Sequence, residues 1–455
     1  MPLQLDTIDV VIVLLSLLAA AAAGLFARNA KDTEATFTDV ALAGRRLTLP
    51  LFVVTLVATW YGAVLGVGEF VHQYGVVVLL CFGVPYYLAA IIYAVTIAPR
   101  IRQTLGTTIP ERIADTYGTS AGRVAAVLVF IVTSPAPYVL MAGELLHAVT
   151  GWDVPVATMV ITVISMGYVI KGGLRSDVAA NVVQIVLMYV GFALLLFYAM
   201  QHYGGFGTLV ASQTQRLDVP GTLGWSGILA WWIIALQTFI DPNFHQRAAA
   251  AVTPTTARRG ILVSVLCWMV FDMLTITTAL YAVTYVDVPR PIDAHLYLAQ
   301  AVLPPVAKGI FVGGIFAAVL STLDGYAIVH GMTLGRDIID AWRGRSATVA
   351  SFRIGIVIAG IAAVIMSIAL PSVIGLFMSL AGYTVPGLLM PLVLSYSRYA
   401  PLLVGGAAMR MVVPSVAVIT ADVLTDVALP TTMLAALVVS ACWHLGIISW
   451  RKGRP

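Results

Sequence analysis

The fold is decided by the stretch ATWYGAVLGVG, residues 58–68, which lies in the middle of an apolar run over residues 48–71. Its three glycines favour an unwound backbone within the membrane, because glycine adopts conformations that other residues avoid. A second interruption is expected in the sequence IDPNF, residues 240–244, where Pro242 lacks the amide hydrogen that a helix requires. Glycines also serve close helix packing in membranes, so the glycines alone leave both interpretations open.

The composition around these stretches is that of a polytopic membrane protein. Of the 455 residues, 60% are apolar and only 10% are charged, and the mean hydropathy of +0.96 excludes a water-soluble chain. A membrane-spanning helix needs about 20 apolar residues. The sequence supplies thirteen such runs, at residues 8–27, 48–71, 75–98, 124–149, 154–170, 179–201, 225–244, 260–284, 309–332, 353–370, 373–396, 402–424 and 428–449.

Lysine and arginine are concentrated in every second connection between the thirteen predicted runs. All but four of the 25 basic residues fall on one side, while Arg216, Arg290 and Lys308 fall on the other and Arg410 lies within the twelfth run. Because basic connections stay in the cytoplasm, we expect a multi-pass protein of the plasma (bacterial inner) membrane, with its N-terminus outside and its C-terminus inside. No basic residue precedes the first run, so we expect a retained helix rather than a cleaved signal peptide.

The positions of the two expected breaks indicate an internal symmetry. If the first run is peripheral, the next ten divide into five and five, and each set begins with a broken helix. An odd number of crossings in each set forces the second set to be inverted relative to the first. The expected divisions are a peripheral helix and link at 1–47, a first five-helix repeat at 48–201, an extracellular loop at 202–224, a second repeat at 225–397, and two C-terminal helices with a short tail at 398–455.

Several short motifs recur in order along residues 40–397. They are GRRL at 44–47, ATW at 58–60, Tyr74-Gly75, GGL at 172–174 followed by Gln184, QR at 246–247 and LST at 320–322. Together they resemble the sodium:solute symporter family, the carriers of sugars, proline, choline and iodide. The resemblance implies an all-α polytopic fold of about 13 transmembrane helices with an inverted five-plus-five repeat of the LeuT type. It also implies Na+-coupled import of a small organic solute by alternating access.

The resemblance places a sodium site where the first broken helix meets the ninth run. By similarity, Ala318, Ser321 and Thr322 face the carbonyls of Ala58 and Tyr61 and complete five oxygen ligands. A hard cation prefers such oxygens, and a membrane interior offers them from unwound carbonyls and from hydroxyl groups. Without the resemblance, a Ser-Thr pair in a membrane helix more often bonds to the carbonyls of the preceding turn.

By the same resemblance the solute lies at mid-membrane between the two broken helices. The ATW stretch is similar to the choline-transporting branch, and an indole can hold a quaternary ammonium by cation-π contact. The core contains carboxylates and no expected basic side chain, so a neutral or cationic solute fits more easily than an anion. Trp231 and Trp232 are expected to be interfacial anchors. The expected lining comprises Thr59, Trp60, Leu65, Gln237, Thr238, Phe377 and Met378.

Ionisable side chains at membrane depth are costly and are therefore functional candidates. Asp241 is expected near the inner end of its helix, where it can gate the path or pair with Arg247. Asp272 and Asp324 are the deepest, and Asp324 follows Ser321 by three residues, which places it to tune the field on a cation. A hydrogen bond to a neighbouring helix explains Asp324 equally well.

One departure from the family pattern bears on stoichiometry. The family usually carries a Thr-Asp pair three residues before the glutamine, and in some members that Asp is tied to a second cation. Here Ala180 and Asn181 take those positions before Gln184. Asp177, one turn earlier and beside Arg175, is expected to be solvated or paired close to the inner surface. Because a second buried cation needs charge compensation, we expect one sodium ion per substrate.

Catalysis is not expected, because the sequence shows no phosphate-binding loop, no Cys/His metal spacing and no nucleophile elbow. The alternatives to a symporter are a symporter-like membrane sensor or receptor domain, against which the short C-terminal tail counts, and a passive solute channel, which would not need sodium. The expected partners are the sodium ion, a small organic solute and membrane lipid, with no nucleic acid and no obligate protein partner.

Overall fold

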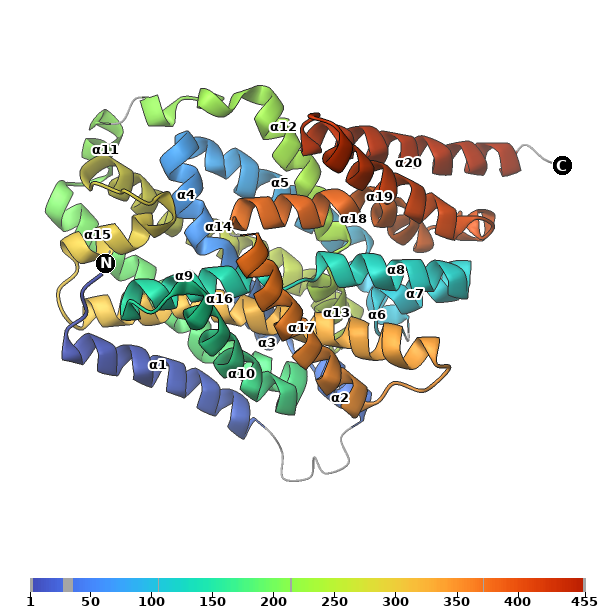
Figure 1. The fold of residues 1–455 in the computed structure, drawn as a ribbon, viewed down its shortest axis with the longest axis horizontal. Helices are drawn as coiled ribbons and strands as arrows, with labels where there is room; N and C mark the ends of the chain where they lie inside the picture. Colours follow the sequence, from blue (N-terminus) through green and yellow to red (C-terminus); the bar gives the residue numbers. More distant parts are fainter. Residues whose placement is uncertain (1–2, 28–35, 105, 213–214, 371, 453–455) are drawn as a thin grey trace.

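The computed structural model describes residues 3–27, 36–104, 106–212, 215–370 and 372–452. Arg28, Lys31 and Arg454, which belong to the basic side of the charge map, lie outside these ranges. The described part is a bundle of helices that run mostly along the long axis of the molecule (Figure 1). Within it, twelve helices are long and apolar enough to cross a membrane.

The crossing segments follow the thirteen predicted runs closely. In chain order they are α1 (Thr7–Phe26), α3 and α4 (Leu49–Trp60, Val64–Tyr74), α5 and α6 (Val84–Thr96, Ala98–Gln103), α8 and α9 (Thr119–Val132, Ala136–Thr150), α10 (Val154–Tyr203), α12 and α13 (Gly224–Ile234, Pro242–Ala250), α14 (Pro254–Tyr285), α16 (Ala307–Met332), α17 (Val349–Ala369), α18 (Val373–Ser395), α19 (Ala407–Leu424) and α20 (Leu429–Lys452).

Shorter helices and single turns connect these segments. The helices are α2 (Phe37–Leu42), α7 (Ile109–Tyr117), α11 (Phe206–Ser212) and α15 (Ala294–Val302). The 3-10 turns are η2 (Ala43–Arg45), η3 (Tyr61–Ala63), η4 (Gly75–Val77), η6 (Gln215–Leu217), η7 (Gly221–Leu223), η8 (Ala235–Phe239), η9 (Pro291–Asp293) and η11 (Ala400–Leu403). Two π-helical segments, η5 (Leu79–Gly83) and η10 (Thr333–Asp340), precede α5 and continue α16. The expected loop at 202–224 therefore contains helical structure of its own.

Helix α10 carries two crossings. Its 50 residues would extend about 75 Å if straight, more than twice the hydrocarbon thickness. The chain turns at Gly173, whose φ of 57° is the left-handed region that favours glycine. Ser165 donates a hydrogen bond to Asp324 of α16, and the Leu187 backbone lies against Gly314, only ten residues away on α16. A straight α10 would separate Ser165 and Leu187 by about 33 Å. Helix α10 is therefore bent, and the described residues contain thirteen segments suited to cross a membrane.

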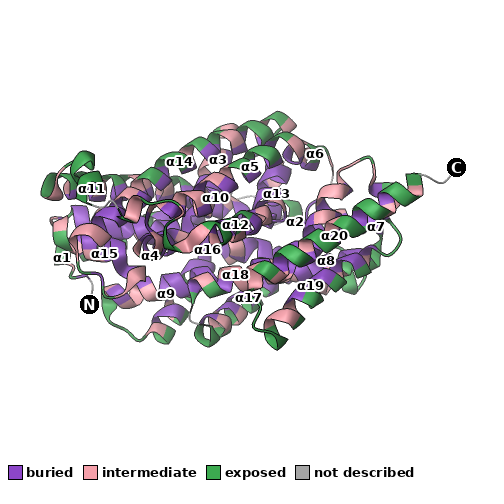
Figure 2. Ribbon diagram, turned by 90° about the horizontal axis from the view of Figure 1, so that it is seen from above, coloured by how far each residue is buried: buried purple, intermediate pink, exposed green. Residues whose placement is uncertain are grey.

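Burial distinguishes the central helix from the peripheral ones. The apolar window of α16 is 94% buried, whereas those of α1 and α20 are only 28% buried. Figure 2 shows the exposed residues gathered on the outer helices and the buried residues on those that surround α16. In Figure 1, α1 begins and α20 ends at opposite ends of the molecule, as an odd number of crossings requires. Helix α16 is therefore the buried centre of the bundle and contacts α3, α9, α10 and α13.

Both expected helix breaks are present. Helix α3 ends at Trp60, the 3-10 turn η3 follows, and α4 begins at Val64. In the second repeat, Ile240 leaves helical geometry and α13 begins at Pro242. Asp241 caps α13 by accepting a hydrogen bond of 2.7 Å from the Asn243 amide. The capping carboxylate thus lies at the break itself.

A third break, which the sequence analysis did not predict, divides the run expected at 124–149. Helix α8 ends at Val132 and α9 begins at Ala136. Pro135 and Pro137 lack amide hydrogens and disfavour a continuous helix here. The Ser134 hydroxyl accepts a hydrogen bond from the Ala136 amide, which supports the start of α9. Three interrupted helices therefore meet in the middle of the bundle.

Candidate functional site

The hydroxyl pair of α16 meets the end of α3. Ser321 Oγ lies 2.7 Å from the Ala58 carbonyl oxygen and 2.9 Å from that of Ala318. Thr322 Oγ1 lies 3.2 Å from the Ala318 carbonyl and 3.5 Å from that of Ala58. Both hydroxyl side chains are fully buried. Four of the five predicted cation ligands are therefore brought together, and we call them with Tyr61 the oxygen cluster.

The turn η3 supplies the remaining member of the oxygen cluster. The Tyr61 carbonyl accepts the Val64 amide within this turn. A Cβ on Gly62 would lie 2.7 Å from both Thr322 Oγ1 and the Tyr138 ring, so only glycine allows this close approach. The backbone break and the hydroxyl pair are thus fitted to each other.

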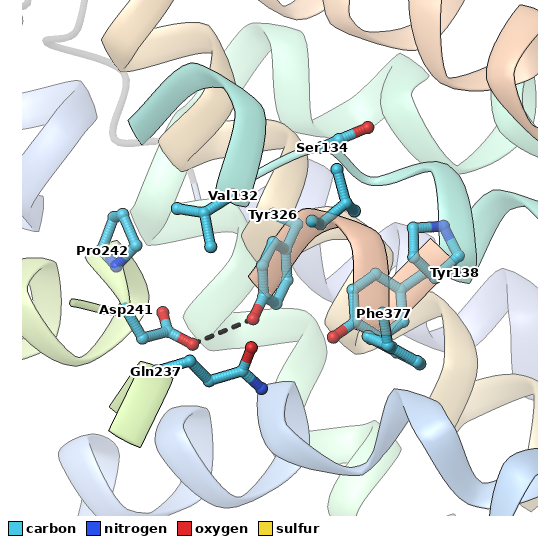
Figure 3. Close-up of a pocket in the computed structure, with 10 residues that line it drawn as sticks. Val132, Ser134, Tyr138, Gln237, Asp241, Pro242, Tyr326 and Phe377 are labelled. Atoms are coloured by element: carbon cyan, nitrogen blue, oxygen red, sulfur yellow. Dashed lines mark hydrogen bonds between the residues drawn. The ribbon is translucent and has the colours of Figure 1, made fainter. Parts of the chain in front are cut away.

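Two adjoining cavities lie beside the oxygen cluster. They share Tyr138, Gln237, Tyr326 and Phe377, so together they form one path, which we call the central cavity. Figure 3 shows the deeper part, where Asp241, Gln237 and Tyr326 point toward a common space. The full lining is Thr59, Trp60, Ala63, Phe82, Tyr86, Val132, Ser134, Pro137, Tyr138, Trp231, Ile234, Gln237, Asp241, Pro242, Tyr326, Phe377 and Leu380.

Four of the seven predicted substrate residues line the central cavity, namely Thr59, Trp60, Gln237 and Phe377. The other three lie elsewhere. Leu65 is buried in α4, Thr238 is fully buried in η8, and Met378 is half-buried on α18. Each neighbours a lining position or break in sequence, but helical geometry turns it away from the cavity.

Trp60 joins the two repeats through its ring. It stacks on Trp268 with ring centroids 5.2 Å apart and contacts Phe244 and Tyr86 edge-on. Trp231, predicted to be an interfacial anchor, is only 5% exposed and lines the cavity, so that prediction is wrong. Its neighbour Trp232 is 38% exposed, as an anchor would be. Adjacent positions on a helix point in different directions, and only one of them can face lipid.

Asp241 lines the deep end of the central cavity. Its Oδ2 accepts a hydrogen bond of 2.9 Å from the Tyr326 hydroxyl, and its Oδ1 accepts the Asn243 amide. The sequence placed Asp241 near the inner end of a helix, but the structure places it at a helix break. The predicted pairing with Arg247 is also not found, because that guanidinium bonds to another carboxylate.

Arg247 forms a fully buried ion pair with Asp177. The distance from Arg247 Nη2 to Asp177 Oδ2 is 3.0 Å, and neither side chain is exposed. The same guanidinium donates to Thr59 Oγ1 at 2.8 Å and to Asn243 Oδ1 at 2.7 Å. Of the two alternatives that the sequence left open for Asp177, solvated or paired, the structure shows a pair, and the partner is Arg247. The pair ties α10 and α3 of the first repeat to α13 of the second.

The two deepest carboxylates bond to hydroxyl groups rather than to cations. Asp324 accepts hydrogen bonds from Ser165 and Tyr168 of α10 and is fully buried. Asp272 accepts a hydrogen bond from Tyr87. The structure thus gives Asp324 the interhelical hydrogen bonds that were the alternative explanation. A part in tuning the cation field stays a prediction for both residues.

Sequence reasoning missed the tyrosines of the central cavity, Tyr86, Tyr138 and Tyr326. Tyr138 and Tyr326 pack ring against ring with centroids 4.8 Å apart. A usable signal was the TSPAP sequence at 133–137, which predicts a break that carries Ser134 and Tyr138 to the cavity. Tyr326 lies one turn beyond Thr322, on the same side of α16.

Comparison with solved structures identifies the fold. A Na+-coupled sialic acid symporter in a substrate-bound, outward-open state matches with a TM-score of 0.84 at 16% sequence identity, over 98% of both chains. A manganese transporter of Eremococcus coleocola matches with a TM-score of 0.52 at 15% identity, over 91% of this chain and 94% of that one. At these identities the likeness shows the fold alone, and it confirms the predicted all-α, LeuT-type architecture.

Sequence comparisons identify the family. Human sodium-coupled monocarboxylate transporter 1 is 23% identical over 338 residues, which are 68% of this chain and 54% of the relative. The high-affinity proline transporter PutP of Bacillus subtilis is 23% identical over 276 residues, which are 55% of this chain and 57% of the relative. The chain spans about half the length of these curated relatives. The model of the sodium:solute symporter family matches residues 41–399, and the chain belongs to that family.

Proposed function

We propose that this protein couples the inward movement of Na+ to the import of a small organic solute by alternating access, across a plasma membrane with its N-terminus outside. The observation that carries the proposal is the oxygen cluster, which lies directly behind the wall of the central cavity. Thr59 and Trp60 line the cavity, and the carbonyl of Ala58, the residue before them, accepts a hydrogen bond from Ser321. A cation and a solute bound here would share one short segment of backbone.

The energy available is sufficient for nutrient uptake. One cation moving inward down 100 mV contributes about 2.3 kcal/mol, which corresponds to roughly fifty-fold accumulation of a neutral solute before any sodium gradient is counted. One ion per solute suffices for such accumulation. The substitution of Asn181 for the usual Asp supports that ratio.

The proposed solute is neutral or cationic, and a quaternary ammonium is included in this class. Seven aromatic rings line the central cavity, namely those of Trp60, Phe82, Tyr86, Tyr138, Trp231, Tyr326 and Phe377. Among the described residues, the lining contains one carboxylate and no lysine or arginine. The curated relatives are named for monocarboxylates and proline. A carboxylate group on a solute would here have to be met by the sodium ion itself.

The test removes the hydroxyl groups of the oxygen cluster one at a time. In Ser321→Ala and in Thr322→Ala, the sodium concentration that gives half-maximal thermal stabilisation of the purified protein should rise at least about tenfold, because each change deletes one ligand. Thr384→Ala is the matched control, since Thr384 is equally buried and bonds only to carbonyls of its own helix. Unchanged sodium affinity in both cluster variants would remove the site from the proposal.

Reconstituted vesicles separate the symporter from its alternatives. A symporter accumulates solute against its gradient only when sodium is higher outside. A passive channel equilibrates solute without sodium, and a sensor binds sodium and solute without moving either. Potassium replaces sodium as the control cation in each measurement.

A further inference from the structure

Resting on the proposed function, we propose that Asp241 receives a protonated amine, so that the solute carries an ammonium group with at least one N–H. The Asp241 carboxylate, the Gln237 amide and the Tyr326 hydroxyl surround the place where this group would lie (Figure 3). This assignment is narrower than a neutral or cationic solute, and it separates N–H ammonium groups from quaternary ones.

Asp241 forms no direct ion pair among the described residues, and the Arg247 guanidinium acts on its charge only from a distance. Arg247, on the same helix, bonds to Asp177, Asn243 and Thr59 instead. The two donors that Asp241 does have, the Asn243 amide and the Tyr326 hydroxyl, are both neutral. A carboxylate within the membrane is costly without charge compensation, and a cationic solute in the central cavity would supply it.

The arrangement of acceptors favours a cation that can donate hydrogen bonds. Each oxygen of Asp241 accepts one hydrogen bond and can accept another. The Gln237 side chain uses its nitrogen to donate to Tyr86 at 3.2 Å, which leaves its carbonyl oxygen as an acceptor. An ammonium N–H can therefore reach two acceptors at once, whereas a quaternary ammonium can bond to neither. The aromatic rings favour both kinds of cation and so do not discriminate between them.

Tyr326 connects the proposed amine site to the helix that carries the hydroxyl groups of the oxygen cluster. Its hydroxyl bonds to Asp241 Oδ2 in this structure, and an incoming N–H can use the second acceptor position of either carboxylate oxygen. Tyr326 lies on α16, four residues after Thr322, so its hydrogen bond joins Asp241 to the helix that carries Ser321 and Thr322. The amine would thus bind beside a contact between α13 and α16.

The experiment compares matched ligands in sodium buffer. The probes are benzylamine, benzyltrimethylammonium and benzyl alcohol, which share a ring, and ethanolamine, choline and ethylene glycol, which share a chain. Affinity is measured by isothermal titration and by thermal stabilisation. Asp422→Asn is the matched control for Asp241→Asn, because Asp422 on α19 also accepts a tyrosine hydroxyl, that of Tyr383 at 2.5 Å, and does not line the central cavity.

We expect the primary amine of at least one set to bind more tightly than its quaternary and hydroxyl analogues. Asp241→Asn should weaken that binding about ten- to hundredfold, the effect of losing a hydrogen bond to a charged group, and Asp422→Asn should leave it unchanged. Tyr326→Phe should keep amine binding, because both oxygens of Asp241 can still accept an N–H. If Asp241 only held α13 to α16, loss of its hydrogen bond from Tyr326 in Tyr326→Phe would instead weaken amine binding.

The outcomes that overturn the assignment are distinct from those that overturn sodium coupling. Equal binding of the amine and its quaternary analogue, no binding of either amine, or full affinity in Asp241→Asn each overturns the amine site. Sodium-dependent stabilisation measured without any amine tests the oxygen cluster separately, and Asp241→Asn should retain it. Loss of the sodium response in the wild-type protein would refute the proposed function instead.

Discussion

The buried pair between Asp177 and Arg247 offers the most quantitative test of this structure. Asp177→Asn removes the negative partner and leaves a guanidinium charge where neither side chain is exposed. Breaking a buried pair in this way costs about 3–5 kcal/mol, which raises the unfolding equilibrium constant roughly 150- to 5,000-fold. The loss of stability in Arg247→Met should lie at the upper end of this range, because the change also removes the hydrogen bonds to Thr59 and Asn243.

The assay is chemical denaturation of the purified protein in detergent, followed by tryptophan fluorescence. The double variant Asp177→Asn/Arg247→Met should be more stable than the sum of the two single losses predicts, because it leaves no uncompensated charge. The reasoning would be refuted if the free energy of unfolding of Asp177→Asn lay within about 1 kcal/mol of the wild-type value. Strict additivity of the two single losses in the double variant would refute it as well.

The pair between Glu144 and Arg290 is the control, because it is partly exposed. Its N–O distance of 2.9 Å is similar, but the side chains are 20% and 43% exposed. The hydrogen bond from Arg290 to Asp293 raises the pKa of the guanidinium, and Glu144 adds to this effect. Glu144→Gln should cost less than about 1 kcal/mol, since solvent screens such a pair and Asp293 remains.

Three further predictions concern the site. Gly62→Ala should abolish sodium-dependent thermal stabilisation, because its methyl group would collide with Thr322. Gly66→Ala is the control and should be tolerated, because nothing lies within 4 Å of a Cβ at that position. Equal effects of the two changes would contradict the close packing at Gly62. Trp60→Ala should reduce solute binding at least about tenfold, and Trp232→Ala, on the exposed side, should not; a titration that shows equal affinities would exclude Trp60 from the solute site. Uptake should rise with sodium at a Hill coefficient near one, and a coefficient clearly above one would show that a second ion is coupled.

The crossing segments could be predicted from the sequence because lipid imposes a simple length and polarity rule on each of them. The two breaks at 61–63 and 240–241 were also predictable, since Gly62 and Pro242 act locally on the backbone. The break before Ala136 was missed although Pro135 and Pro137 signal it. An apolar run that contains proline still satisfies the length rule, so the rule alone hides such a break.

The partners of the charged residues could not be predicted from neighbours in the sequence. Asp177 lies two residues from Arg175, which suggested a local pair, but its partner Arg247 is 70 residues away. The turn at Gly173 brings Asp177 into the bundle, and no periodicity in the sequence specifies that direction. Trp231 shows the same limit, because aromatic residues at a helix end can face lipid or a cavity.

The division of polar groups among helices has an evolutionary consequence. The oxygen cluster draws on α3, η3 and α16, whereas Gln237 and Asp241, the acceptors that would distinguish one solute from another, lie on and after η8. A substitution at position 237 or 241 can alter the cargo without touching an atom of the cluster. The proposed solute site and the proposed sodium site are thus formed by separate segments of the chain. Selection can therefore change the solute that is bound while the residues of the sodium site stay the same.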